Sequence, residues 1–473
     1  MSMKRRAQSA KQTSLFVATQ TLPTSPGHPF YEKLNKLLDE HGFDEYVEDL
    51  CVSYYHATLG RRSIPPGVYF RMLMVGYFEG LDSERGIAWR VADSLSLRRF
   101  LGFDLSESTP DHTSLSKIRN RLPASVYESV FRWVLQLLKR EGLLRGETVA
   151  VDATTLEANA ALRALVRRDS GMGYREYLQD LARGEGIDTP TREDEARIDK
   201  QRPRKASNKD WQHPHDPQAR VAKMKDGRTH LAHKLEQVVD LDTQAVLGVR
   251  VTSADAGDTQ TISATLAQAD ANVAAVAAAD PVPDPDVRAC PLGEVVADKG
   301  YHSNEVLETL RAEGRRTYIA EPKRGRRKWK GKHAARDAVY ANRRRIRGRR
   351  SKALQRQRAE RTERPFAHSL ETGAMRRTHL RGHEKISKRM LIHYAGVNLG
   401  LAMRTRYTMG TPRGLHDLLH ALLRACVMRI WRHVAVSCDV GQSLASAPSR
   451  REPWRCGRRR ARPDSRTAFS PGC

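Results

Sequence analysis

The sequence predicts an all-helical amino-terminal region followed by an α/β core. Apolar residues recur at helical spacing through the first third of the chain, and from about residue 147 short apolar strands alternate with helices. The chain has 473 residues, enough for two or three domains, and a net charge of +27. These observations predict at least two domains and a polyanionic partner.

The first two segments are a polar arm and a helical domain. Residues 1–28 end in Pro-Thr-Ser-Pro-Gly and are interpreted as a mobile arm. Residues 29–146 carry helical patterns, for example Phe30, Leu34 and Leu37, and a helix opens at Pro65-Pro66. In "TPDHTSLSKIRNRL", Thr113 or Ser114 is placed to cap a basic helix. We therefore expect a separate helical domain with a basic face.

The α/β core is expected over residues 147–436. It begins with a buried strand that ends at Asp152, and the charged stretch at about 157–228 is interpreted as an insertion or large loop. Two strands joined by a hairpin, an alanine-rich helix, a strand, a helix capped by Ser303 or Asn304, and a last strand follow. A basic segment covers 323–361, and "ISKRMLIHYAGVNLGLAMR" is helical. The aperiodic basic stretch 437–473 is expected to be a disordered tail.

The composition favours nucleic acid over a membrane as the polyanionic partner. No apolar run approaches the roughly 18 residues of a membrane span, and the basic amino terminus lacks the features of a secretory signal. The six cysteines form no CxxC pair, which argues against a zinc site or a disulfide framework and favours a reducing cytoplasm. Nucleic acid is therefore the expected partner, and a membrane is not.

Two aspartates follow apolar strands in the same way. Asp152 closes "VAVD" and Asp298 closes "VVAD", which runs into a glycine turn. Either one alone is commonly a turn or cap residue, but two at strand ends of one α/β core can converge. Clustered carboxylates repel unless a cation lies between them, and oxygen ligands without His or Cys suit Mg²⁺ or Mn²⁺.

A third carboxylate would complete such a site. The candidate is Glu363, although Glu360 and Glu371 lie close to it in the sequence. Because proline is tolerated only in the first turn of a helix, Pro365 predicts that Glu363 begins a helix, with Phe366 one turn on. Glu371 precedes Thr372-Gly373, an expected helix end, where a carboxylate opposes the helix dipole.

The segments that carry these residues resemble the DDE transposases of bacterial insertion sequences. The similar blocks, in the family's order, are "VDATTLEANA", "DPQARVAKMKDGRTHLAHK", "VVADKGYHS" and "ERPFAHSLETGAMRRTHLRGHEKISKRMLIHYAGVNLGLAMR". The helical segment with "TPDHTSLSKIRNRL" resembles the family's amino-terminal domain. The resemblance covers about residues 30–435.

The resemblance implies a fold, an activity and a site. It implies a ribonuclease-H-like catalytic domain in which Asp152, Asp298 and Glu363 bind two Mg²⁺ or Mn²⁺ ions, cleave DNA at the element's ends and transfer the strand into target DNA. The family often has a Lys seven residues after its glutamate, where this chain has Leu370. Arg364, Arg376 and Arg377 are the nearby candidates to replace it.

DNA contacts are expected on two basic surfaces. The basic segment interleaves aromatic residues with Arg and Lys, a mixture that grips phosphates and stacks on bases. The residues assigned to DNA are Lys117, Arg119 and Arg121 in the helical domain, and Lys323, Arg326, Arg327, Trp329, Arg343, Arg344, Arg345, Arg364, Arg376 and Arg377 in the core. We expect a homodimer on DNA, associated with the nucleoid in the cytoplasm.

Several residues and functions remain as alternatives. His213 and His215 are assigned to a polar loop rather than a metal site, and Asp258 to a helix cap. A decayed or domesticated DNA-binding protein, and a ribonuclease-H-like nuclease without joining activity, are the competing functions.

Overall fold

The computed structural model describes residues 27–56, 58–60, 63–202, 206–224, 227–279, 292–323, 325 and 327–413. Most of the expected arm, Arg326 and the expected tail at 437–473 lie outside the described residues. No helix within these ranges is both long enough and apolar enough to cross a bilayer.

The amino-terminal region is helical, as expected. Its helices are α1 (Pro29–Glu40), α2 (Phe43–Cys51), α3 (Pro66–Glu79), α4 (Glu84–Asp93), α5 (Leu95–Phe100), α6 (His112–Arg121) and α7 (Ala124–Arg140). Helix α6 is capped by Asp111, whose carboxylate accepts from the Ser114 amide at 2.9 Å, and not by Thr113 or Ser114. A carboxylate there also faces the positive end of the helix dipole, which a hydroxyl cannot exploit.

The α/β region is built on one mixed sheet. Its strands are β1 (Thr148–Glu157), β4 (Arg220–Lys223), β5 (Thr229–Asp240), β6 (Val246–Ser253), β7 (Glu294–Ala297) and β8 (Arg316–Ile319). The order is β4-β5-β1-β7-β8, with β6 also paired to β5. Strands β1, β7 and β8 are parallel, whereas β5 is antiparallel to β1, β4 and β6. The parallel strands therefore end at one common edge.

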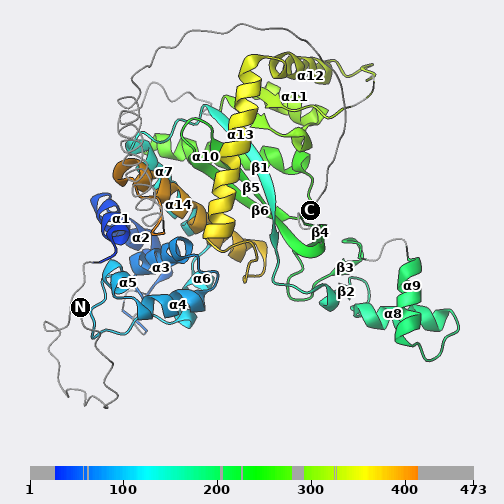
Figure 1. The fold of residues 1–473 in the computed structure, drawn as a ribbon, viewed down its shortest axis with the longest axis horizontal. Helices are drawn as coiled ribbons and strands as arrows, with labels where there is room; N and C mark the ends of the chain where they lie inside the picture. The colour runs from blue at the N-terminus through cyan, green and yellow to red at the C-terminus, as the bar shows by residue number, and fades with distance from the viewer. Residues whose placement is uncertain are drawn as a thin grey trace, which may run out of the picture. The chain divides into compact units, whose positions relative to one another are not determined.

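Helices cover both faces of this sheet. They are α10 (Asp258–Ala278), α11 (Asn304–Ala312), α12 (His333–Ile346), α13 (Arg349–Ala367) and α14 (His383–Tyr407). Glu236 of β5 bonds to Thr261 and Thr265 of α10, while the adjacent Gln237 bonds to α13. Because successive strand residues point to opposite faces, α10 and α13 lie on opposite sides of the sheet. Figure 1 shows α13 crossing the strands.

The charged insertion is a folded lobe rather than a loop. It contains β2 (Val166–Arg167), α8 (Tyr174–Gly184), α9 (Arg192–Gln201) and β3 (Trp211–Gln212), and Figure 1 shows it projecting beyond β4. Trp211 is buried against Leu165 and Leu231, and α8 packs on α9 through Leu178 and Ile198. These two small apolar clusters form the core of the lobe.

Helix α14 joins the helical region to the sheet. It is buried along most of its length and packs against α3, α7 and β6. Asn398 of α14 makes two hydrogen bonds of 2.9 Å with the backbone of Val246 in β6, and Gly396 lets Tyr77 of α3 approach closely. One continuous hydrophobic core therefore spans both regions, so the helical region is not the separate packing unit that we expected.

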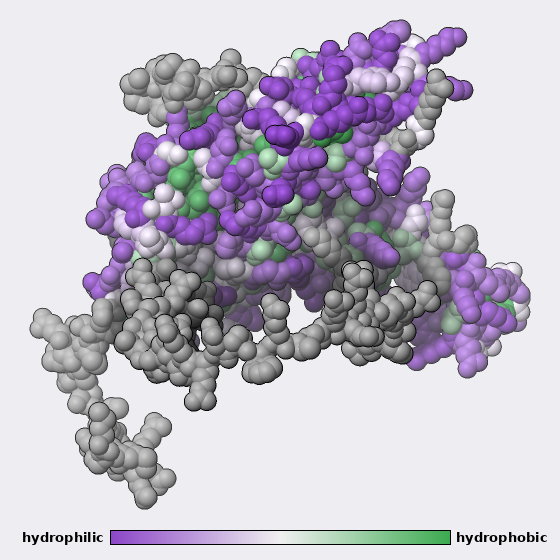
Figure 2. Space-filling model, turned by 45° about the horizontal axis from the view of Figure 1, so that its top comes forward, coloured by the Kyte–Doolittle hydropathy of each residue, from purple (hydrophilic) through white to green (hydrophobic). Residues whose placement is uncertain are grey.

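The basic segment is mainly helical. It forms α12 and the first two-thirds of α13, and Asn342 of α12 bonds to both backbone polar groups of Ile319 at the end of β8. The face of the molecule in Figure 2 is dominated by hydrophilic residues, with apolar residues in small patches. This segment thus combines attachment to the sheet with a solvated, positively charged outer face.

Candidate active site

Asp152 lies within β1 and not at its end, in contrast to the sequence prediction. Parallel pairing of β1 with β7 stops at Ala150, whereas antiparallel pairing with β5 continues to Glu157. The strand is prolonged because β5 is long enough to pair with it beyond Asp152. Asp152 nevertheless occupies the place where β1 loses its parallel neighbour, so its side chain lies at the common edge of the parallel strands.

Asp298 follows β7 directly. Its carboxylate caps the short 3-10 turn Lys299–Tyr301 by accepting from the Gly300 amide at 2.8 Å. The parallel register that pairs Ala150 with Val296 places Asp152 and Asp298 level with each other on adjacent strands. The two predicted aspartates are therefore neighbours at one sheet edge.

Helix α13 is held across this edge by polar anchors. Gln355 donates to the carbonyls of Ala297 and Tyr318, which belong to the ends of β7 and β8, at 3.2 and 2.7 Å. Gln237, the cross-strand partner of Asp152, donates to the carbonyl of Thr362 at 2.6 Å. These bonds join α13 to β5, β7 and β8, so the helix has a defined position over the site.

Asp152 itself is held by α13. Its Oδ2 accepts from Arg358 Nη1 at 3.1 Å and from the Thr362 hydroxyl at 2.9 Å. These residues are four apart and share one face of the helix. Sequence reasoning missed Arg358, Thr362 and Gln237. The signal for the first two was present in their helical spacing, but the proline rule predicted a helix that begins only after them.

Glu363 lies in the last third of α13, not at a helix start. The helix runs through Pro365 to Ala367 and continues as a π-helical turn at His368–Thr372. Pro365 lacks the amide for one helical hydrogen bond, yet the helix continues for two more residues before the π-helical turn begins. The expectation of a new helix at Glu363 was therefore wrong, whereas Phe366 does line the same pocket as Glu363.

A pocket of about 350 Å³ joins the carboxylates on β1 and α13. Asp152, Glu363 and Glu371 line it, together with Arg358 and Arg376. Glu371 is engaged by Arg376, and Glu360 by Arg364, whereas no ion pair links Glu363 to any other described residue. Of the two glutamates that line this pocket, Glu363 is therefore the one whose carboxylate forms no ion pair with another described residue.

Burial and neighbouring charge set the ionisation of Asp152. Burial raises the pKa of Asp152 above its usual value, and the charge of Asp298 adds to this, while Arg358 and the Thr362 hydroxyl act in the opposite direction. The charge of the ionised form is therefore only partly offset by Arg358 and the Thr362 hydroxyl. Within the described ranges, however, no three acidic, histidine or cysteine side chains are close enough to form a ready metal cluster.

Asp258 occupies a different position from the expected one. The N-cap of α10 is Gly257, and Asp258 is the first helical residue. Its carboxylate and that of Asp298 both lie next to Gly300, where a Cβ would be 2.5 and 3.1 Å from their oxygens. Lys234 of β5 forms an ion pair with Asp258 at 2.7 Å. The reassigned Asp258 therefore belongs to the surroundings of the site.

The residues assigned to DNA divide into two groups. Lys117, Arg121, Lys323, Arg344, Arg364, Arg376 and Arg377 are exposed, and the last three of these also form surface ion pairs with Glu360, Glu371 and Glu157. Others are committed within the protein: Arg119 pairs with Glu84, Arg327 and Arg343 pair with Glu321, and Arg345 donates to Thr317. Trp329 is partly buried, with its ring 6.2 Å from that of Tyr340.

The two histidines of the insertion differ. His215 is exposed, but His213 is buried at the base of the lobe near Asp216, which bonds to His233 of β5 at 3.2 Å. The expected polar loop is thus correct only for His215. No metal site is formed there among the described residues.

Two family models match this chain. Residues 19–121 match a transposase domain of the DUF772 type, and residues 208–399 match the transposase DDE domain. The second match includes Asp298 and Glu363 but begins after Asp152. The class defined by these matches is that of the transposases. More narrowly, the chain belongs to the DDE transposases of insertion sequences. A search of curated proteins gave no match.

Proposed function

We propose that this chain cleaves DNA at the ends of its insertion sequence and transfers the cut strand into target DNA. The observation that carries the proposal is the position of Asp152 and Asp298 at one sheet edge, with Glu363 lining the pocket beside Asp152. The strand order, with three antiparallel strands followed by two parallel ones, supports a ribonuclease-H-like core. Membership of the DDE transposases supports DNA as the substrate.

The donor set fits Mg²⁺ or Mn²⁺. All three candidate ligands are carboxylates, the hard oxygen donors that these ions prefer, and partial burial raises the pKa of Asp152. Bound metal would lower the pKa of the attacking water or hydroxyl and stabilise the leaving oxygen. Asp152 and Asp298 would hold it from the sheet and Glu363 from α13, and binding requires that these carboxylates be ionised.

The chain's own residues would arrange the substrate. Arg376 lines the carboxylate pocket and Arg358 contacts Asp152, so both supply positive charge where a phosphodiester must approach three carboxylates. Such charge offsets repulsion between the phosphate and the site. The anchors at Gln237 and Gln355 keep α13, and with it Glu363, registered against the sheet.

The test is a cleavage and joining assay with the purified full chain. The substrate is linear duplex DNA that carries the ends of the element, incubated with Mg²⁺ and a target plasmid. Wild type should cut and join, while Asp152→Asn and Asp298→Asn should do neither and still bind DNA in EDTA. Asp242→Asn, which changes a carboxylate outside the site, is the matched control.

The competing functions have distinct outcomes in this assay. Cutting without joining would identify a nuclease and contradict strand transfer. Binding without cutting by the wild-type chain would identify a decayed DNA-binding protein. Loss of DNA binding in both aspartate variants would mean that these residues are structural.

A further inference from the structure

A second pocket lies where the helical region meets the segment that follows α13. It has a volume of about 460 Å³ and is lined by residues of α3, α4, α6, α7 and α14 and by His379 and Leu380. Its cationic residues are Arg85, Arg119, Lys388 and Arg389, against the carboxylates of Asp82 and Glu84. The lining of this junction pocket thus has an excess of positive charge.

Arg389 is the central feature of the junction pocket. It is 5% exposed, and its Nη2 donates to the carbonyl of Leu81 at 2.7 Å. Its Nε is buried and has no hydrogen-bond partner among the described residues, and no carboxylate pairs with it there. A buried guanidinium without a counter-ion is costly, because a charge removed from water needs a compensating anion.

The neighbouring groups do not supply that anion. Asp82 is bonded to His379 at 2.7 Å, and Glu84 is engaged by Arg119 and by Ser116. Lys388 pairs with Glu384 at 2.7 Å, and Arg119 also has a buried Nε without a partner among the described residues. Both arginines line the pocket and each has a buried Nε without a partner among the described residues, so their positive charge is incompletely compensated there. Guanidinium groups of this kind are typical phosphate ligands.

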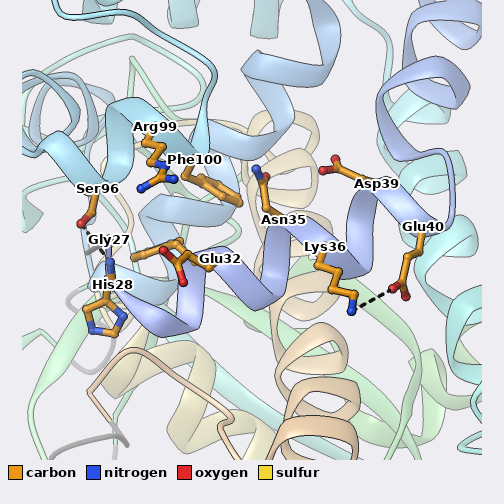
Figure 3. Close-up of a pocket in the computed structure, with 11 residues that line it drawn as sticks. Gly27, His28, Glu32, Asn35, Lys36, Asp39, Glu40, Ser96, Arg99 and Phe100 are labelled. Carbon is orange, nitrogen blue, oxygen red and sulfur yellow. Dashed lines mark hydrogen bonds and ion pairs between the residues drawn. The ribbon is translucent and has the colours of Figure 1, made fainter. Parts of the chain in front are cut away.

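Another pocket of the same volume does not have these properties. Figure 3 shows it between α1 and α5, where Lys36 pairs with Glu40 at 3.8 Å and Glu32, Asp39 and Arg99 also line it. It is lined by charges of both signs near the surface. Size alone therefore does not single out the junction pocket.

The junction pocket is linked to the carboxylate pocket by a short segment. Arg376 lines the carboxylate pocket, and His379 and Leu380 line the junction pocket. Between them, Arg376 and Thr378 bond to the backbone of Glu157 at the end of β1, at 3.0 and 2.9 Å. Three residues of chain span at most roughly 10 Å, which is on the order of three base steps of a DNA strand.

We propose that the junction pocket binds a backbone phosphate of the DNA strand, about three base steps from the phosphate that lies at Asp152 and Asp298. The position of the DNA in this inference rests on the proposed function, whereas the anion site itself does not depend on it. The phosphate would accept from Arg389 and Arg119 inside the pocket and from Arg85 at its rim. Such a contact holds the strand in register and carries no base specificity.

The first experiment tests the anion site with inorganic phosphate. Thermal unfolding of the full chain is compared in potassium phosphate and potassium chloride at equal ionic strength. Wild type should unfold several degrees higher in phosphate, because a ligand that binds only the folded state stabilises it. Arg389→Met and the exposed Arg85→Gln should abolish most of this increment, and Arg99→Gln, in the pocket of Figure 3, should keep it. Equal unfolding temperatures of the wild type in the two salts would overturn the proposal.

The second experiment tests DNA as the source of the phosphate. The salt dependence of binding to a 30-bp duplex is measured in EDTA, where cleavage does not occur. Removing one phosphate interaction lowers the slope by about 0.9, so Arg389→Met and Arg85→Gln should each show a reduction of that size, and Arg389→Lys should retain the wild-type slope. Loss of the phosphate increment in Arg389→Met and Arg85→Gln with unchanged slopes would show a site for free phosphate and refute the DNA contact. Failure of the wild type to cleave DNA, with the slopes of the two variants reduced as expected, would instead count against the proposed activity alone.

Discussion

Arg358 and Asp152 form an ion pair of 3.1 Å that places a cation from α13 on the carboxylate expected to bind metal. Arg358→Met should lower stability in EDTA by about 1–3 kcal/mol at neutral pH, less than a fully buried pair would cost. Mg²⁺ should then raise the unfolding temperature of the variant more than that of wild type, because the ion replaces the missing cation. Arg361→Met on the same helix is the control. Equal Mg²⁺ increments in Arg358→Met and wild type would contradict this relationship.

Asp152→Asn should stabilise the metal-free protein at neutral pH. The pKa of Asp152 is raised in the folded state, chiefly by burial, so its protonated form favours folding. The stabilisation that the protonated Asp152 gives the folded state is complete below the usual pKa of 3.8. This stabilisation is lost as the pH rises through the pKa of Asp152 in the folded state. The neutral amide should therefore raise the unfolding temperature at pH 7 and give no gain near pH 3. A lower unfolding temperature at pH 7 would show that the bonds to Arg358 and Thr362 dominate.

The third carboxylate can be assigned by three single variants. Glu363→Gln should abolish cleavage and leave DNA binding intact, because Glu363 has no ion-pair partner among the described residues and lines the pocket with Asp152. Glu360→Gln, one turn earlier on the same helix, should cleave like wild type. Glu371→Gln should weaken cleavage only modestly, because it breaks the ion pair with Arg376. Inactivity of Glu371→Gln beside an active Glu363→Gln would reverse the assignment.

The basic segment should bind DNA through its exposed arginines only. Combined Arg344→Gln and Arg347→Gln should reduce the salt-dependence slope by about 0.9 for each phosphate that is no longer neutralised. Arg343→Gln is the matched control, because Arg343 is engaged by Glu321 in two hydrogen bonds. It should lower the unfolding temperature and leave the slope unchanged. A slope change for Arg343→Gln alone would mean that this ion pair opens when DNA binds.

The sequence predicted those parts of the fold that depend on local patterns. Helical spacing located the amino-terminal helices, and two apolar strands located Asp152 and Asp298. The extent of β1 could not be predicted, because it depends on the length of a partner strand some 80 residues later in the chain, β5. The position of Glu363 in α13 was missed because a proline rule overrode the helical pattern before it.

The polar anchors of the site were beyond sequence reasoning for a similar reason. Gln237 and Thr362 are far apart in the chain, and only the docking of α13 on the sheet makes them partners. The core of the insertion could not be predicted either, because its few apolar residues come together around Trp211 only in the folded lobe. Local residue preference assigned Asp258 as the N-cap of α10, but the N-cap is Gly257 and Asp258 is the first residue of the helix.

The shared core has a consequence for the order of events during synthesis. Tyr77 of α3 is buried against Gly396 of α14, so part of the amino-terminal core is supplied by a helix made more than 300 residues later. The nascent helical region emerges with that surface unfilled and exposed to other chains or chaperones. Synthesis that stops before α14 is complete would release an amino-terminal region with this apolar surface exposed, which favours aggregation.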